Sequence, residues 1–509
     1  MPTPSALSGG YLSGSRRPQS TVDGERRCSY IVVVAIPEIQ AGLHASFSDL
    51  QWVIDAYALT LASLMLTSGS LADLYGRRRL FALGLVIFTA GSLLCGLAQS
   101  PLMLILSRSG QGVGGAIIFA TSLALLAQSF RGKDRGVAFG VWGAITGAAV
   151  ALGPILGGLI TSGISWRGIF LVNVPIGIAV IAMTLAKVDE SRAQRAPRPD
   201  WLGFALLTAG LVSLVYGLIR ASEIGWGDGG VVACLICSGL LLMGFVFAER
   251  CSAQPMLDLE LFRIPTFVGG LIAAFAMNAS LFAMFLYLVI YLQDALGYSA
   301  VATGLRLLLV TGALLIASTA AGRASSRVPM KWLIGPGLGL VGLGLLLMSG
   351  LDGSSSWRHL IGGFVVAGIG AGMVNPPLAS TAVGVVAPER AGMASGVNST
   401  FRQIGVATAI AGLGSVFATS LPRHLDHALI ATPTLRGRGP QIAAAVRHGD
   451  TAHLFDATPA ALRDTLGAAI RSSFATGVNE LLIITGVVAL LGAVCALVLI
   501  RNKDLRLRP

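Results

Sequence analysis

The feature that most constrains this chain is a series of apolar segments, each long enough for an α-helix to cross roughly 30 Å of hydrocarbon. A chain built mainly of such segments is expected to fold as an all-α polytopic membrane protein. A further candidate, 30–37, is too short to cross as a regular helix. The segments predict thirteen membrane-spanning helices over 51–72, 79–98, 102–128, 136–162, 168–187, 200–220, 229–249, 265–292, 301–322, 332–350, 358–386, 396–421 and 477–500.

The amino-acid composition excludes the other classes of fold. Hydrophobic residues make up 54% of the 509 residues and charged residues only 12%, about half their share in soluble proteins. A soluble globule with so little charge could not cover its surface, and disordered, collagen-like and disulfide-scaffold chains have different compositions. The 6 Cys are scattered, and the sequence contains no cluster of metal ligands and no nucleophile–base pair. We therefore expect neither an enzyme nor a bound cofactor or metal.

The positions of Lys and Arg predict the orientation of the chain in the cell membrane. The net charge of +12 would indicate a nucleic-acid partner in a soluble protein. In a membrane protein it marks cytoplasmic loops, so the expected partner is the lipid bilayer and not nucleic acid. The loops around 38–50, 99–101 and 293–300 carry no Lys or Arg and are placed outside, as is the long polar loop 422–476. Basic residues cluster at 77–79, 131–135, 187–198, 250–263, 323–331, 390 and 501–508, which are placed inside.

The start of the chain does not fit this topology. Thirteen spans would leave residues 1–50 outside, and the polar tail 1–29 resembles neither a signal peptide nor a membrane helix. The first helix is therefore expected to be short and irregular, or truncated.

Two opposite charges inside predicted spans are candidates for proton coupling, because a charge within the membrane is costly and is by default functional. Asp55 and Arg108 each lie about 9–10 Å to the outer side of the bilayer centre, counted along their helices. An acid and a base at one depth can neutralise each other, and the acid can exchange its partner for a proton. The alternatives are that the pair is a fixed brace, or that Asp55 faces water at the outer rim.

A third charge and several polar side chains are candidates for lining a central cavity. Arg402 is predicted to lie only about six residues deep from the cytoplasmic side, where a gate or a packing contact explains it as well as transport does. The other candidates are Gln111, Asn278, Tyr287 and Tyr291, and packing is the favoured interpretation for the last three.

A glycine-rich turn after the first confident span carries an acid beside a basic run. It reads Gly69-Ser-Leu-Ala-Asp73-Leu-Tyr-Gly76-Arg77-Arg78-Arg79. This resembles the G-x-L-a-D-r-x-G-r-r signature of the major facilitator superfamily. Such a group makes a charge relay that can break and reform as two helix bundles rock, although a solvated topology signal is the alternative.

Further motifs favour export. Leu104-x-x-x-Arg108-x-x-Gln111-Gly112 is similar to the Arg-containing motif of proton-coupled efflux members. Gly140…Gly153-Pro154-x-x-Gly157-Gly158 is similar to the antiporter signature, with Ala149 in place of its second Gly. Stretches at 166–177, 255–262, 291–293 and 396–405 narrow the resemblance to the fourteen-helix drug:proton antiporter branch (EmrB/QacA type) over about 30–500.

The resemblance implies a fold and a function. The fold is two six-helix bundles plus an inserted helix pair, and the function is proton-driven efflux of amphipathic drugs or antibiotics across the cytoplasmic membrane by alternating access. Asp55 and Arg108 would couple protons. Asp73, Arg77 and Arg78 would gate the inner side, with Asp73 facing the start of 396–421 in the outward-open state. The expected divisions are the tail 1–29, bundle 30–188, inserted segment 189–264, bundle 265–501 and tail 502–509.

The first span departs from the family pattern. Cys28, Tyr30 and Val33 stand where family members usually carry Asp, Thr and Asn. Two alternatives to drug efflux therefore stay open: an exporter of one self-made metabolite, and a truncated, impaired transporter. The small-molecule substrate itself depends on cavity shape, which the motifs do not specify.

Overall fold

The described part of the chain is helical throughout its regular structure. Twelve of its helices are long and apolar enough to cross a membrane, and they correspond to twelve of the thirteen predicted spans. The expected all-α membrane fold is therefore confirmed. The other predicted span, 136–162, and the candidate 30–37 lie largely outside the described residues. The computed structural model describes residues 36–45, 47–129, 138–139, 141–142, 145, 153, 156–157, 159–161, 163–190, 200–252, 255–325, 327–387, 390–430, 432, 434–435, 437–448 and 451–504.

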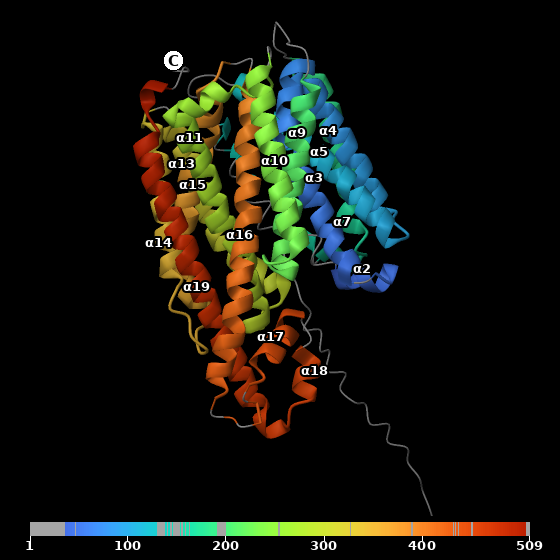
Figure 1. Ribbon diagram of the computed structural model, residues 1–509, viewed down its shortest axis with the longest axis vertical. Coiled ribbons are helices and arrows are strands. Elements are labelled where there is room, and N and C mark those ends of the chain that lie inside the picture. The colour runs from blue at the N-terminus through green and yellow to red at the C-terminus, as the bar shows by residue number, and fades with distance from the viewer. Residues whose placement is uncertain are drawn as a thin grey trace, which may run out of the picture.

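A first group of helices is arranged around α5 (blue to cyan in Figure 1). α3 and α4 both pack along α5, and α4 also packs against α8. The short helix α2 covers the outer end of this group, where Ile39 is fully buried beside Trp166 and Phe170. The members are α2 (Ile36–Leu43), α3 (Phe47–Tyr75), α4 (Arg77–Gly96), α5 (Pro101–Ser129), α7 (Gly168–Leu171) and α8 (Asn173–Lys187).

A second group contains most of the buried apolar core. In it α15 packs against both α13 and α14, and α19 packs against α14 and α11. One span, Pro265–Gln293, contains π-helical turns on either side of α12. The members are η1 (Leu259–Arg263), α11 (Pro265–Met277), η2 (Asn278–Phe282), α12 (Ala283–Ile290), η3 (Tyr291–Ala295), α13 (Ala300–Ala324), α14 (Met330–Leu347), η4 (Trp357–His359), α15 (Leu360–Gly384), α16 (Ala391–Ala428) and α19 (Ala460–Leu499).

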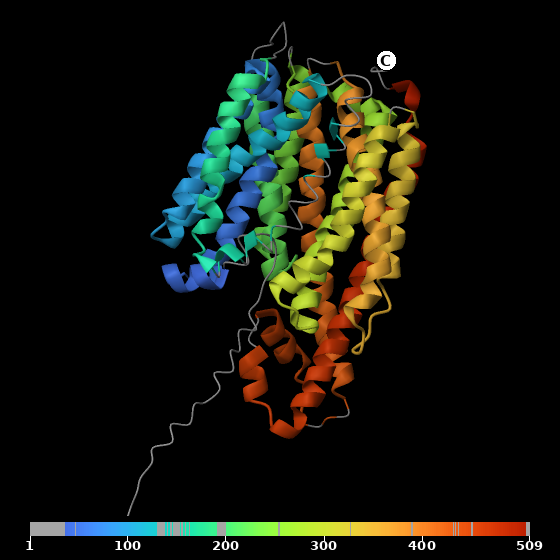
Figure 2. The same cartoon turned by 180° about the vertical axis from the view of Figure 1, so that it is seen from behind.

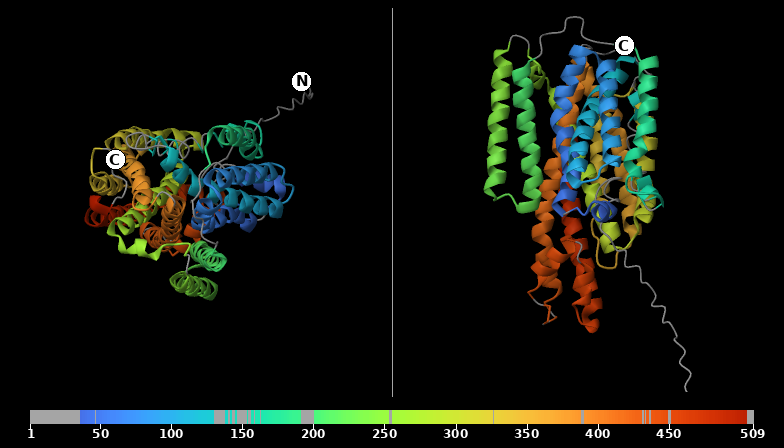
Figure 3. Two further views of the ribbon diagram at one scale, coloured as in Figure 1. Left: turned by 90° about the horizontal axis from the view of Figure 1, so that it is seen from above. Right: turned by 90° about the vertical axis from the view of Figure 1, so that its right-hand side faces the viewer.

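Two antiparallel helices, α9 (Trp201–Ile224) and α10 (Gly229–Cys251), lie side by side at one edge of the molecule (Figure 3, right). Asp200 and Asp228 cap their N-termini by accepting hydrogen bonds from backbone N–H groups, which otherwise have no partner within a helix. α9 packs against α3 of the first group and against α16 of the second. The pair therefore lies beside the boundary between the two groups.

Glycines allow the helix backbones to approach closely. Close packing matters here because the hydrophobic effect does not drive membrane helices together, since lipid tails are as apolar as the side chains. A Cβ atom built on Gly344 of α14 would lie 2.5 Å from the backbone nitrogen of Ala367 in α15. At Gly339 of the same helix, a Cβ would meet nothing within 4 Å. Position along one helix therefore decides whether a glycine is required.

The region predicted as a polar external loop, 422–476, is largely helical, so this expectation is corrected. α16 continues to Ala428, two short helices follow, α17 (Gly439–His448) and α18 (Thr451–Asp456), and α19 begins at Ala460. They form the part of the molecule that projects below the membrane helices in Figure 2. Outside the bilayer a helix needs only one apolar face. Leu425, Ile442 and Leu466 supply such faces and are at most 1% exposed.

We predict that Gly344→Ala lowers the stability of the protein and that Gly339→Ala does not. The added methyl group at position 344 must displace backbone atoms of α15, and overpacking of this kind costs about 1–3 kcal/mol. At position 339 the better helix propensity of Ala gives no loss, or a gain of up to about 1 kcal/mol. Thermal unfolding of the two variants in detergent measures the difference. Equal midpoints would contradict the close-packing argument.

Candidate functional site

The two helix groups meet through α3 and α16 at the end that carries the basic loops, which is the predicted cytoplasmic end. A Cβ atom on Gly69 would lie 2.2 Å from the carbonyl oxygen of Gly392, and one on Gly396 would lie 2.9 Å from the Cα of Leu66. No larger side chain fits at either position without moving a helix. The sequence motif therefore has its glycine where the backbones of α3 and α16 come together.

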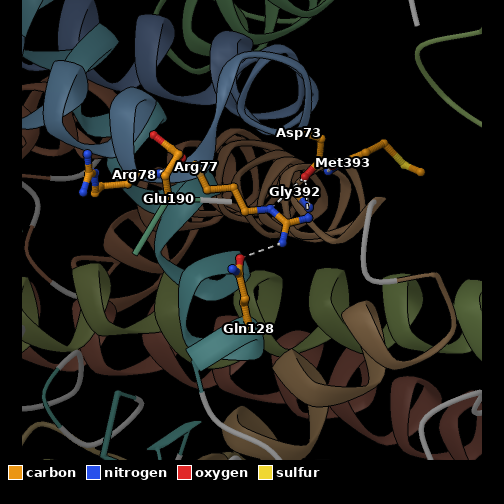
Figure 4. Close-up of polar contacts among 7 residues, drawn as sticks. All are labelled: Asp73, Arg77, Arg78, Gln128, Glu190, Gly392 and Met393. Carbon is orange, nitrogen blue, oxygen red and sulfur yellow. Dashed lines mark hydrogen bonds and ion pairs between the residues drawn. The ribbon is translucent and has the colours of Figure 1, made fainter. Parts of the chain in front are cut away.

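Asp73 lies at this contact and binds the first turn of α16 (Figure 4). Its carboxylate accepts hydrogen bonds from the backbone N–H groups of Gly392, at 3.0 Å, and Met393, at 2.8 Å. The N-terminus of a helix carries partial positive charge and unpaired N–H groups, so a carboxylate there is stabilised. The side chain is buried, with 9% of its surface exposed. Residues 320 apart in the sequence, Asp73 and Met393, thus form one polar contact.

Arg77 supplies the positive charge that this buried carboxylate needs. Its Nε and Nη2 donate to Asp73 Oδ1 at 3.0 and 2.7 Å, and its Nη1 donates to Gln128 near the end of α5 at 3.3 Å. Breaking such a buried pair by removing one partner typically costs about 3–5 kcal/mol. The Asp73–Arg77 pair therefore connects α3, α4, α5 and α16 at one point.

The next two residues of the motif bind the segment after α8. Glu190 accepts hydrogen bonds from the backbone N–H groups of Arg78, at 3.1 Å, and Arg79, at 3.2 Å, at the start of α4. The Arg78 guanidinium donates to the carbonyl of Val188 at 3.1 Å. Gly76 precedes them with a φ of 109°, in the region that favours glycine. Arg77 and Arg78 are therefore held by specific contacts, whereas the side chain of Arg79 is 71% exposed.

The loop after α10 adds a second contact near the start of α16, and the sequence did not single it out as a site. Asp258 forms an ion pair with Arg390, the residue before α16. Leu257 and Leu261 are buried beside Leu66 of α3 and Met393 of α16. From the sequence, the stretch at 255–262 was identified only as part of the family resemblance. Its alternation of Leu with an acid was the signal that could have identified it.

Burial along α3 and α16 changes from one end to the other. Residues 391–400 of α16 are all buried, whereas nine of the residues 401–410 are partly exposed. In α3, residues 65–70 are all buried, whereas residues 57–60 are all partly exposed. The contact between the two helix groups is therefore tight at the cytoplasmic end and looser toward the outer side.

Arg108 is buried in a polar cluster of the first helix group. Its Nε donates to the carbonyl oxygen of Val53 at 3.0 Å, and its Nη1 donates to Gln111 at 2.5 Å. Gln111 in turn donates to Ser92 at 2.6 Å. The guanidinium carbon lies 4.1 Å from the ring centre of Tyr57, a cation–π distance. The charge of Arg108 is therefore met by a carbonyl, an amide and a ring.

Asp55 and Arg108 lie at the same level, since Arg108 reaches the carbonyl oxygen of Val53, but the two do not pair in this conformation. Among the described residues, the contacts of Arg108 do not include Asp55. Val53 and Tyr57 contact Arg108, and Asp55 is two residues from each, about 200° around the helix. Trp52, three residues before Asp55, stacks on Tyr216 of α9 at 5.9 Å. The partly buried Asp55 therefore lies on the side of α3 that faces α9.

The other candidates for cavity lining are packed among helices. Gln111 is 2% exposed, Asn278 7%, Tyr287 7% and Tyr291 1%. Asn278 donates to the carbonyl of Ala274 at 2.8 Å, at the π-helical turn. Tyr287 donates to the carbonyl of Ile410. In this conformation these contacts favour packing as their role.

Arg402 lies deeper in the membrane than predicted, which is a correction. α16 begins at Ala391 and not near 396, so Arg402 is eleven residues, or about 16 Å, from its first residue. This is close to the middle of a hydrocarbon layer of roughly 30 Å. The prediction from apolar length missed the first turn because its small residues, such as Gly392 and Gly396, contact α3 and not lipid. Arg402 is partly exposed.

The antiporter motif is described only in part. Gly153 and Gly157 are helical and buried. Gly140, Pro154 and Gly158 lie outside the described residues. The role expected for these five residues stays a prediction.

Comparison with known proteins identifies the family. The model of the Major Facilitator Superfamily matches residues 28–410. The chain is 37% identical over 404 residues to the multidrug resistance protein Stp of Mycobacterium tuberculosis (strain CDC 1551 / Oshkosh), covering 78% of this chain and 75% of Stp. It is 33% identical over 482 residues to the tetracenomycin C resistance and export protein of Streptomyces glaucescens, covering 92% and 88%. It is 37% identical over 396 residues to the cephamycin export protein CmcT of Amycolatopsis lactamdurans, covering 76% and 81%.

The chain therefore belongs to the major facilitator superfamily, and the resemblance found in its motifs is confirmed. It is a multi-pass membrane transporter and not an enzyme. Among solved structures, the human organic anion transporter MFSD10 (TETRAN) has a similar fold, with a TM-score of 0.56 and 14% sequence identity over 89% of this chain and 88% of that one.

We predict that Asp73→Asn opens the cytoplasmic end. Loss of the negative charge leaves Arg77 buried without its ion pair and weakens the bond to α16. A cysteine placed at the buried position Ser395, with the native cysteines replaced, should react at least about tenfold faster with an impermeant maleimide in inside-out vesicles.

Asp258→Asn is the matched control, because its ion pair with Arg390 is exposed, with 30% and 52% of the two side chains accessible. Exposed pairs are worth about 0–1 kcal/mol, so labelling should rise less than about fivefold. Equal labelling of the two variants would show that Asp73 does not hold the gate.

Proposed function

We propose that this chain exports amphipathic drugs or antibiotics across the cytoplasmic membrane in exchange for protons, by alternating access between two helix bundles. The observation that carries the proposal is the contact of Asp73 with the first turn of α16. It holds the cytoplasmic end closed while the outer parts of α3 and α16 are partly exposed. Relatives named for multidrug resistance and for export support efflux as the direction.

In the proposed architecture, 30–188 and 265–501 form the two bundles and 189–264 is the inserted helix pair with its cytoplasmic loops. The contacts of α9 with both α3 and α16 support this division, because a helix at the boundary can stay in place while the bundles rock. The ion pair between Asp258 and Arg390 ties the loop after α10 to α16. The inserted pair would therefore stabilise the state that is closed to the cytoplasm.

The gate of the proposed cycle depends on few strong contacts. When the cytoplasmic end opens, Asp73 leaves the N–H groups of Gly392 and Met393, but it can keep Arg77, which lies four residues away on the same side of the molecule. The carboxylate is then never left without a positive partner. Of the polar contacts of Asp73, only the two backbone hydrogen bonds are exchanged for water, so its contribution to the free-energy difference between the closed and open states is small.

Proton coupling in this proposal begins at the outer side. Asp55 takes a proton from outside, which neutralises the carboxylate and weakens its attraction for bound substrate, so that the substrate is released. Arg108 keeps a fixed positive charge next to Tyr57 and Val53 on the opposite side of α3. That charge would favour the deprotonated form of Asp55 when the carrier faces the cytoplasm, where the proton leaves.

A second candidate is an exporter of one self-made metabolite on the same fold. Relatives whose names specify a single compound, tetracenomycin C or cephamycin, favour it. The two candidates differ in substrate range and share the gate and the coupling. Accumulation of ethidium, Nile red and calcein, as cationic, neutral and anionic dyes, distinguishes them in cells expressing the full chain.

We predict that Asp55→Asn abolishes proton-driven efflux, because an amide cannot exchange the coupling proton. Cells with the unchanged protein should accumulate less dye than control cells until a protonophore is added. Cells with the variant should accumulate as much dye with or without the protonophore. Asp49→Asn, which removes a carboxylate 6 residues earlier in α3, is the matched control and should retain efflux. Proton-driven efflux that survives Asp55→Asn would overturn the coupling role.

A further inference from the structure

Arg402 is a charge well inside a membrane-spanning helix, and no described residue is an anionic partner for it. Within the described part of the chain it donates one hydrogen bond, from Nη2 to the amide oxygen of Asn375 at 3.0 Å, and forms no ion pair. Its Nε is enclosed and has no hydrogen-bond partner there. Arg77, by contrast, has a carboxylate at 2.7 Å. A partly enclosed charge within a membrane-spanning helix is costly without an opposite charge, so the site favours an incoming anion.

A second polar side chain next to Arg402 also lacks its partners. Asn398 lies one helical turn earlier on the same face of α16, and it is 1% exposed. Neither its amide oxygen nor its amide nitrogen has a hydrogen-bond partner among the described residues. Buried polar groups are nearly always hydrogen-bonded to protein, water or ligand. Asn398 and Arg402 together therefore offer unused donors at one place.

The surroundings add an aromatic face and an irregular helix. The guanidinium carbon of Arg402 lies 6.0 Å from the ring centre of Trp142, which belongs to the first half of the chain. Asn375 directly precedes Pro376 and Pro377 inside α15, and proline removes backbone hydrogen bonds and bends a helix. The group therefore combines residues from both halves of the chain near mid-membrane, which is where transporters of this kind bind their cargo.

We propose that Arg402, with Asn375, Asn398 and Trp142, binds an anionic group attached to an aromatic ring, so that the exported compounds include aromatic carboxylates or similar acids. The guanidinium would form charge-assisted hydrogen bonds with the anion, and the amide of Asn398 would donate to it. The indole ring of Trp142 would stack on the aromatic part. This inference rests on the proposed export function and specifies its substrate class.

The test measures binding, so it does not depend on proton-driven transport. Purified full-length protein, in chloride-free gluconate buffer, is heated with 2-naphthoate, 2-naphthamide or 2-naphthylmethylammonium, which share a ring system and differ in charge. Binding to the folded state raises the unfolding midpoint. Naphthoate should bind at least about tenfold more tightly than either matched compound. Equal shifts for the three compounds, or none for naphthoate, would overturn the proposal.

Two variants locate the site, each compared with its own midpoint without probe. Arg402→Gln should remove the preference for naphthoate. Asn375→Asp places a carboxylate at hydrogen-bond distance from Arg402 with almost no change of shape, so it should keep the protein folded and also remove the preference. A preference that survives in either variant overturns the assignment.

Arg306→Gln is the matched control, because Arg306 is also enclosed by aromatic rings, 3.6 Å from Tyr298 and 5.0 Å from Trp357, but lies near the outer end of α13. It should keep the preference, and a loss there instead would place the anion site at the outer rim and refute the proposal. Chloride that stabilises the protein as strongly as naphthoate would indicate an inorganic counterion and would also refute it. If the unchanged protein binds naphthoate with the expected preference but shows no proton-driven efflux, the proposed function is wrong and the anion site stands.

Discussion

The close approach of α3 and α16 at the cytoplasmic end is the constraint on which the rest of this structure depends. Gly69 brings the two backbones together, and only then can Asp73 reach the N–H groups of Gly392 and Met393. A bulkier residue in place of Gly69 would separate the helices and leave a charge enclosed without its donors. The contact thus needs both the small size of Gly69 and the negative charge of Asp73, and neither holds the two helices together without the other.

The two arginines nearest the middle of the membrane have contrasting surroundings. Arg108 has a carbonyl, an amide and an aromatic ring close by, so its charge is accommodated within one helix group. Arg402 lies where the two halves of the chain meet, and in the described part of the chain it has one hydrogen-bond partner, the neutral Asn375. A satisfied charge can stay in place through a cycle, whereas an unsatisfied one favours a state that brings it a ligand. In the proposed mechanism, Arg108 on α5 therefore keeps a fixed charge, and Arg402 on α16 recognises the ligand.

The membrane helices and the motif at 69–79 could be predicted from the sequence. The direction in which a side chain points, and its contacts with residues far away in the chain, could not. The length of the apolar segments identified the spans, because the thickness of the hydrocarbon layer sets the length of a membrane-spanning helix. It misplaced the start of α16, and with it the depth of Arg402, because the first turn of that helix faces protein. Depth alone also paired Asp55 with Arg108, although the helical period places Asp55 on the other side of α3 from Val53 and Tyr57. The unfilled donors of Asn398 could not be read from sequence, since they depend on what surrounds it.

The length of α16 has a mechanical consequence. It runs without interruption from Ala391 at the gate to Ala428 beyond the outer membrane surface, a span of about 57 Å at 1.5 Å per residue. A rod of that length converts a tilt of about 10° at its inner end into a displacement of about 10 Å at its tip. The helices α17 and α18 lie at that end of α16, so they would be displaced by a similar distance whenever the inner end opens. An antibody fragment or a spectroscopic label on those helices would therefore report the state of the inner gate from outside the cell.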